Sequence, residues 1–426
     1  MPTDSPDVSY RALLRIPSLA RVVASMQLAR IAGAMTGVAL VLFTLLEYDS
    51  PALAGAVTLA SILPGLALSP IAGALLDRHG RVRLVQLDYV IAACALVLVG
   101  SLSLAGALPP PLLLLIAGMA SLTNPLSQTG LRSLFPIMVP RRLWERVNAV
   151  DSNGYVVAII IGPPLAAIIL SIVGPALGLV LIAIPMAIAA LVLIGVREPH
   201  TETATTGNLL LDAWQGLMYV LHNPTLRGLG VGMTLNNFAN GAVSIIVPLL
   251  VLDAVGAGEL AVGIAFAVSG LTGMVSAFWV GRMDTRGREW KMLWLAMLGA
   301  AIPIGLLLPG AAGWADGLLA GYGLVLLAQG LSGLFAGPLD ISMFTMRQRR
   351  TDPAWLGRAF AVSMAINFSG FPIGAAVAGA LASWSLPAAV GLAVVAGVLS
   401  SVASALLVPK TDRMDEPDRL RPAPAR

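Results

Sequence analysis

The chain has 426 residues, of which 57% are hydrophobic and only 11% are charged, whereas soluble domains carry about 25% charged residues. This composition excludes a water-soluble fold, because too few charged side chains are present to cover its surface. The formal net charge of +4 comes from short basic clusters between apolar stretches. We therefore interpret it as a sign of membrane topology and expect no nucleic-acid partner.

Long apolar stretches recur along the whole chain, and a helix needs about 20 apolar residues to cross a bilayer. We therefore expect an all-α membrane protein with twelve transmembrane helices, arranged as two six-helix bundles related by pseudo-two-fold symmetry. The predicted spans are 18–46, 51–76, 84–106, 112–137, 148–172 and 175–196, followed by 225–252, 259–281, 291–308, 316–343, 358–382 and 386–408.

The basic residues alternate between successive loops once the N-terminus is placed in the cytoplasm. Arginines follow the second span at Arg78, Arg81 and Arg83, and others follow the eighth at Arg282, Arg286 and Arg288. The opposite loops contain acids such as Glu47 and Asp253 but no Lys or Arg. Because basic loops stay on the cytoplasmic side, we expect a multi-pass protein of the cell membrane with both termini in the cytoplasm.

The chain divides into two halves joined by a polar segment. We predict an N-terminal six-helix bundle at 1–197, a cytoplasmic linker with a surface helix at 198–224, a C-terminal six-helix bundle at 225–409 and a cytoplasmic tail at 410–426. The sequence Asp77-x-x-Gly80-Arg81 recurs as Asp284-x-x-Gly287-Arg288, a shift of 284 − 77 = 207 residues. Such a repeat indicates duplication, and it places the substrate path between the halves.

The loop after the second span carries the most specific motif, with Gly73, Asp77, Arg78, Gly80 and Arg81 in order. Gly73 permits close helix approach, Asp77 can accept charge-assisted hydrogen bonds, and Gly80 permits a tight turn. The motif resembles the signature loop of the major facilitator superfamily. That resemblance covers essentially the whole chain, and it implies an alternating-access transporter whose Asp77 and Arg81 belong to a charge network gating the cytoplasmic face. Asp284, Gly287 and Arg288 form a weaker copy of the motif.

The fifth span contains Gly154-x7-Gly162-Pro163. These residues are typical of a bent, tightly packed helix, and they also resemble the antiporter motif of drug-exporting branches of the superfamily. The match departs from that motif where Ala166 and Ala167 replace a usual glycine pair.

Two further segments, 28–31 and 132–136, are similar to bacterial macrolide and siderophore exporters. The resemblance implies proton-coupled efflux of a small, partly apolar molecule. Such exporters often carry an acid in the middle of the first span, whereas residues 33–36 supply none.

Polar residues within the spans are candidates for proton or substrate binding, because charges are costly in hydrocarbon. Arg30 has three interpretations: it extends to water, pairs with Asp151, or contacts an anionic substrate. Asp151 and Asp340 are candidate proton carriers, and we prefer Asp340 because the tenth span lines the cavity in the resembled family. Asn236, Asn237 and Asn240 are candidates either for interhelical hydrogen bonds or for substrate contact.

The sequence shows no pattern of an enzyme. Its three histidines are scattered, it has one cysteine, and it lacks a phosphate-binding glycine loop. We expect no metal and no cofactor, transport driven by an ion gradient, and a monomer in the lipid bilayer whose partners are a small-molecule substrate and protons. A proton-linked or passive importer of a polar nutrient is the alternative, and a non-transporting sensor or membrane enzyme is a second one.

Overall fold

The computed structural model of the chain describes residues 10–198, 209–283, 285, 287–315, 320–352 and 356–410. All regular secondary structure in this part of the chain is helical. Twelve helical stretches within it are long and apolar enough to cross a membrane. The predicted fold class is confirmed, and each predicted span overlaps one of these stretches.

The first half begins with a short helix and contains six spans, two of which are interrupted. The breaks fall shortly before Pro64 and Pro125, because proline lacks a backbone N–H and disfavours helical backbone in the preceding residue. The helices are α1 (Tyr10–Leu14), α2 (Leu19–Tyr48), α3 (Pro51–Ala60), α4 (Leu63–His79), α5 (Arg81–Leu104), α6 (Pro110–Ser121), α7 (Asn124–Gly130), α8 (Phe135–Met138), α9 (Trp144–Val173) and α10 (Pro175–Val192).

The second half follows the same plan, and its fourth span is again broken near a proline, Pro338. A helix occupies the segment where the surface helix was predicted; its position on the membrane remains a prediction. The helices are α11 (Leu209–His222), α12 (Pro224–Leu249), α13 (Glu259–Val280), α14 (Glu289–Ile304), α15 (Leu308–Ala311), α16 (Ala320–Leu334), α17 (Ala336–Arg349), α18 (Leu356–Ala382) and α19 (Leu386–Leu407).

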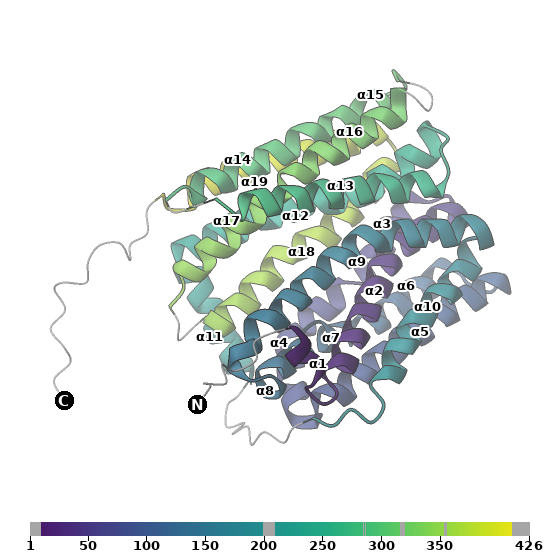
Figure 1. Cartoon of the computed structure of the whole chain (residues 1–426). Coiled ribbons are helices and arrows are strands. Elements are labelled where there is room, and N and C mark those ends of the chain that lie inside the picture. The colour runs from purple at the N-terminus through teal and green to yellow at the C-terminus, as the bar shows by residue number, and fades with distance from the viewer. Residues whose placement is uncertain are drawn as a thin grey trace, which may run out of the picture.

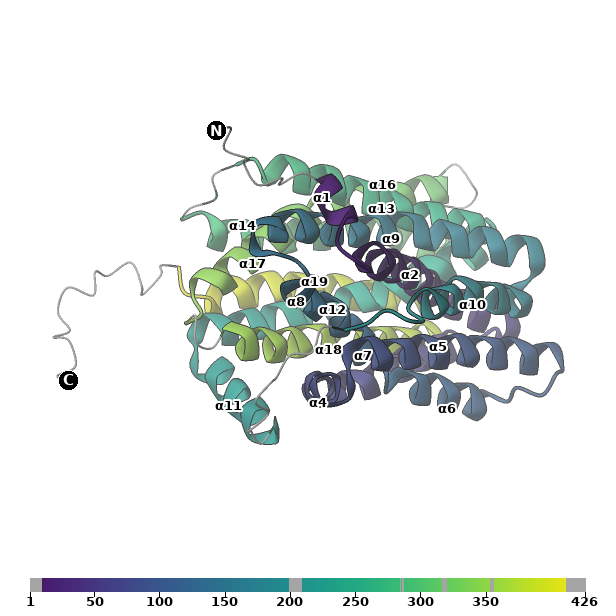
Figure 2. The same ribbon diagram turned by 60° about the horizontal axis from the view of Figure 1, so that its bottom comes forward.

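Corresponding helices of the two halves have corresponding neighbours. In the first half α2 packs against α9 and α10, and in the second half α12 packs against α18 and α19. Figures 1 and 2 show the spans running alongside one another, with α11 at one end of the molecule and α15 at the other. The shared pairing is consistent with two related bundles.

The halves meet along two helix pairs, α3 with α18 and α9 with α13. Gly55 lies against the backbone of Ala375 and Ala376, and Gly263 lies against Pro163 and Pro164. Close to Gly55, an apolar cluster joins both halves: Val41, Leu45, Ala54, Ile245, Leu249 and Ala375. These contacts lie in the part of the spans remote from α11.

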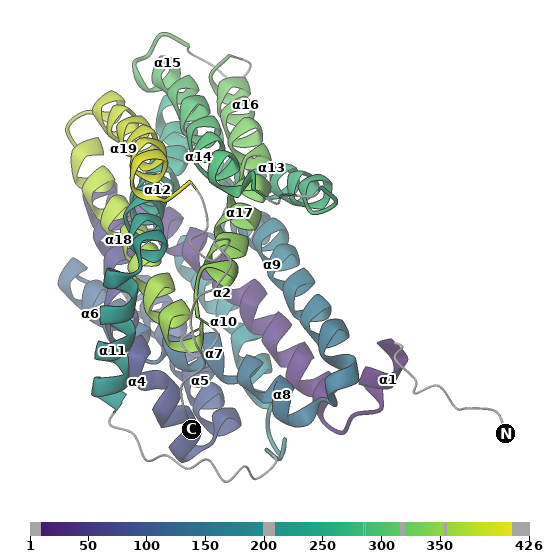
Figure 3. The ribbon, with the colours of Figure 1, turned by 90° about the vertical axis from the view of Figure 1, so that its left-hand side faces the viewer.

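Helices α9 and α13 separate toward the end of the molecule where α11 lies (Figure 3). Gly263 lies against Pro164 and Gly270 lies against Ile160. One further turn of this antiparallel arrangement would bring Val157 opposite Met274, yet these side chains are 44% and 40% exposed. The bundles are therefore in contact near the acidic loops and apart, along this pair, near the basic ones.

Candidate functional site

A buried ion pair joins the first and fifth spans of the first half. The Arg30 guanidinium on α2 donates to the Asp151 side chain at 2.5 Å and to the Asp151 backbone carbonyl at 2.9 Å. Asp151 is only 2% exposed. The structure therefore forms one of the three arrangements that the sequence left open for Arg30, its pairing with Asp151.

Aromatic and basic side chains surround this pair. The guanidinium carbon of Arg30 lies 3.7 Å from the centre of the Tyr155 ring, and Nε of Arg132 lies 3.2 Å from the second carboxylate oxygen of Asp151. The Arg132 side chain is 54% exposed. The sequence analysis did not identify Tyr155, although its position one turn after Asp151 on the same helix face was a usable signal.

The antiporter-like motif lies at the contact of three helices. A side chain at Gly154 would overlap Gln27 of α2, and one at Gly162 would come within 2.5 Å of the Ala34 side chain. Pro163 lies against Gly263 of α13, in the other half. This geometry agrees with the packing interpretation, since the glycines let α2 approach α9 and the proline lies at the seam between the halves.

In the second half a neutral hydrogen-bond cluster occupies the corresponding place. Asn237 on α12 donates to the backbone carbonyls of Met233 and Asn367, at 3.0 and 3.1 Å. The three asparagines are therefore not equivalent: Asn237 links two helices, Asn236 is buried and Asn240 is exposed.

Asp340 lies on α17 and is exposed. Three residues before it, Gly337 packs against Ala277 of α13; three residues after it, Met343 packs beside Asn367 of α18. Asp340 thus lies on the face of α17 between these two neighbours. Among the residues that the structure describes, none forms an ion pair or a hydrogen bond with its carboxylate.

The signature loop is held by an acid that the sequence analysis missed. Glu198, after α10, pairs with the Arg81 guanidinium at 2.8 Å and accepts a hydrogen bond from the Arg81 backbone N–H at 2.7 Å. Arg78 is exposed. Gly73 and Asp77 belong to α4, and the structure does not describe their surroundings. The isolated acid at the end of the sixth span, next to basic loops, was the signal for Glu198.

The weaker copy of the motif also has its glycine at a positive φ angle. Gly80 and Gly287 have φ angles of 89° and 74°, a left-handed conformation that favours glycine. Arg288 is exposed, and Asp284 lies outside the described residues. After this turn the buried Glu289 pairs with Arg349 at 2.5 Å, a contact that the sequence analysis also missed.

A second buried arginine, Arg347, was not among the sequence candidates. It is 1% exposed, and its guanidinium lies 2.6 Å from the sulfur of Met364 on α18. The side-chain amide of Asn367 is oriented so that its nitrogen faces an acceptor and its oxygen faces a donor. In this orientation the amide oxygen accepts a hydrogen bond from the Arg347 guanidinium at 2.5 Å. Arg347 and Asn367 therefore form a polar cluster between α17 and α18; Arg347 contacts the side chain of Asn367, whereas Asn237 contacts its backbone carbonyl.

Comparisons with known proteins agree on the class of the chain. The family model described as "Major Facilitator Superfamily" matches residues 23–320 and 229–425. The chain is 35% identical over 407 residues to the MFS-type transporter y4rN of Sinorhizobium fredii, covering 94% of this chain and 98% of that one. It is 26% identical over 367 residues to the multidrug efflux pump Tap of Mycolicibacterium fortuitum, covering 82% and 86%.

Solved structures with the same fold include two of the nucleoside transporter NupG. They match with TM-scores of 0.74 and 0.68 at 14% and 13% identity. The alignments cover 92% and 90% of this chain, and 99% and 96% of the others. At this identity the likeness concerns the fold alone.

Proposed function

This chain is a transporter of the major facilitator superfamily, and on that premise we propose that it exports a small, partly apolar molecule in exchange for protons. The basic ends of the spans lie in the cytoplasm. The separation of α9 from α13 at those ends gives the solute access from the cytoplasm, and rocking of one half against the other exposes it to the outside.

The position of Asp340 is the main support for proton coupling. Asp340 is exposed within a span, and no described residue supplies a counter-charge to its carboxylate. Such a charge is costly inside a membrane. Binding of a proton removes that cost, so proton uptake and release at Asp340 can bias the halves between two arrangements.

The Arg30–Asp151 pair has a different role in this mechanism. Asp151 receives two contacts from Arg30 and one from Arg132, so its charge is compensated in place. We assign the pair to holding α2 against α9 as the first half moves. Asn240, exposed on α12, is a candidate for contact with the solute.

Two observations support export over import. Pro163 of the antiporter-like motif lies against Gly263 at the seam between the halves, and the sequence similarity to Tap, an efflux pump, extends over 82% of the chain. Import of a polar nutrient is the alternative, and it requires the opposite direction of net flux through the same path.

Everted membrane vesicles that contain the full chain test both direction and coupling. With an inside-acidic pH gradient imposed, an exported solute accumulates inside the vesicles, and collapse of the gradient by a protonophore abolishes the accumulation. Asp340→Asn should lose this dependence, whereas the control Glu47→Gln, an exposed acid at the other end of the molecule, should keep it. Gradient-dependent accumulation by the Asp340→Asn variant would rule out Asp340 as the proton site. Loss of solute from vesicles that contain the unmodified chain would favour import.

A further inference from the structure

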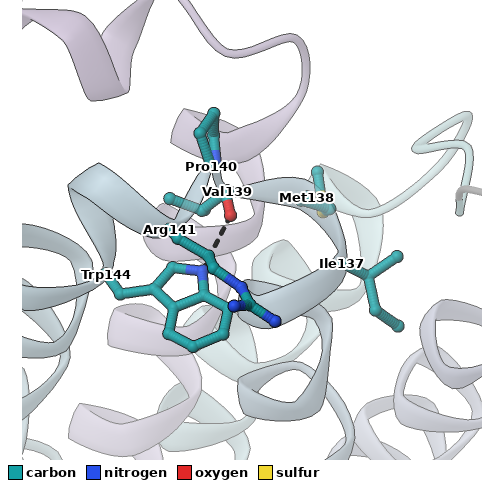
Figure 4. Close-up of a pocket in the computed structure, with 6 residues that line it drawn as sticks. All are labelled: Ile137, Met138, Val139, Pro140, Arg141 and Trp144. Atoms are coloured by element: carbon teal, nitrogen blue, oxygen red, sulfur yellow. Dashed lines mark hydrogen bonds between the residues drawn. The ribbon is translucent and has the colours of Figure 1, made fainter.

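The chain between the fourth and fifth spans forms a pocket outside the proposed transport path. It has a volume of about 590 Å³ and is lined by Ile137, Met138, Val139, Pro140, Arg141 and Trp144 (Figure 4). The apolar stretch before it ends at Leu134, and the one after it begins at Arg141. The pocket therefore lies at the boundary between hydrocarbon and water, at the basic end of the molecule.

One wall of the pocket is fixed by hydrogen bonding and stacking. The indole N–H of Trp144 donates to the backbone carbonyl of Val139 at 2.8 Å. The Arg141 guanidinium carbon lies 5.7 Å from the centre of the Trp144 ring, alongside it (Figure 4). Tryptophan is enriched at this depth of the membrane, because its ring is apolar and its N–H is polar.

The charge of this loop is not compensated by the described protein. Arg141 and Arg142 are both exposed, and no described residue forms an ion pair with either. Elsewhere at the same end of the molecule, Arg81 and Arg349 pair with Glu198 and Glu289. The pocket thus presents the Arg141 guanidinium, with the exposed Arg142 next to it in the chain, and guanidinium groups bind phosphate through two parallel hydrogen bonds.

We propose that this pocket binds the phosphate head group of an anionic phospholipid. Arg141 and Arg142 contact the phosphate, and the half-buried Ile137 and Met138 lie beside the start of the acyl chains. A lipid fits this site because cationic, aromatic and apolar groups meet there at head-group depth. Cytoplasmic leaflets are rich in anionic lipids that attract basic residues next to a span.

Native mass spectrometry of the purified full chain tests this inference independently of transport. The probes are phosphatidylglycerol and phosphatidylcholine with identical acyl chains. The unmodified protein should retain phosphatidylglycerol preferentially, and Arg141→Gln with Arg142→Gln should weaken its binding roughly tenfold. A matched control, Arg227→Gln with Arg282→Gln, removes two exposed arginines at the same end and should change binding less than twofold.

Two outcomes would overturn the proposal. If both double variants lose phosphatidylglycerol equally, the attraction comes from general surface charge and not from the pocket. If glycerol 3-phosphate, which lacks acyl chains, displaces phosphatidylglycerol at comparable concentration, the pocket binds a soluble phosphate. Trp144→Phe keeps an aromatic ring but removes the indole N–H that bonds to Val139, and it should weaken lipid binding only modestly. An unchanged thermal unfolding temperature in each variant confirms that the chain is folded.

Discussion

Arg30 and Asn237 occupy equivalent positions in the two halves, 237 − 30 = 207 residues apart, the same shift that relates the two signature loops. Each donates a hydrogen bond to a backbone carbonyl on the fifth span of its own half, Asp151 for Arg30 and Asn367 for Asn237. The contact is charged in the first half and neutral in the second. The acceptors are 367 − 151 = 216 residues apart, so the two halves link their first and fifth spans in a similar way but not at the same register.

Removal of the Asp151 charge should destabilise the protein, because it leaves the largely buried Arg30 guanidinium without its counter-charge. We expect Asp151→Asn to lose about 3 kcal/mol of unfolding free energy, measured by denaturant unfolding in detergent. The double variant Arg30→Gln with Asp151→Asn should recover part of this loss. A double variant less stable than Asp151→Asn would show that the charges do not depend on one another.

A methyl group at Gly162 should disturb the contact between α2 and α9. It would lie 2.5 Å from the Ala34 side chain, closer than carbon atoms approach, so Gly162→Ala should cost about 1–3 kcal/mol and reduce transport. The matched control is Gly37→Ala on α2, where a methyl group has no neighbour within 4 Å. Thermal unfolding and solute flux, measured side by side, should separate the two variants; equal behaviour would contradict the assigned packing role.

Loss of the Glu198 carboxylate should affect both transport and stability. Glu198→Ala removes the ion pair with Arg81 and the bond to its backbone N–H. Because the Arg81 and Glu198 side chains are only 12% and 19% exposed, the expected cost is about 1–3 kcal/mol. The solute flux should also fall several-fold, since the signature loop loses its anchor. Glu259→Ala, at the opposite end of the molecule, is the control, and a similar loss of flux there would show that the effect is not specific to the loop.

Paired cysteines should report the separation of α9 from α13. In a Cys94→Ser background, Ile160→Cys with Gly270→Cys should cross-link readily, because these positions touch. Val157→Cys with Met274→Cys should cross-link poorly in the resting protein and faster during turnover, when the basic ends close. Rapid cross-linking of both pairs at rest would mean that the resting halves are closed along their whole length.

The sequence by itself determined the number and order of the spans, and it predicts their direction. The length of an apolar stretch and the side on which arginines occur are properties of the chain taken in order, so they need no knowledge of helix contacts. The repeated motif was equally readable, and Gly80 and Gly287 do both have a positive φ angle. The structure confirmed the fold that these features predict. The same features identified Arg30, Asp151 and Asp340 as polar groups inside the spans.

Only the tertiary structure decided which polar groups meet. Whether Arg30 reaches Asp151, and whether Glu198 reaches Arg81, depends on the rotation of each helix about its axis and on its tilt toward neighbours far away in the chain. Sequence spacing places residues on a helix face but does not say what that face touches. Asp151 and Asp340 are both acids within spans, yet their surroundings differ in charge. Packing surrounds Asp151 with arginines and leaves Asp340 without a described counter-charge, and this difference separates a positioning role from a candidate proton site.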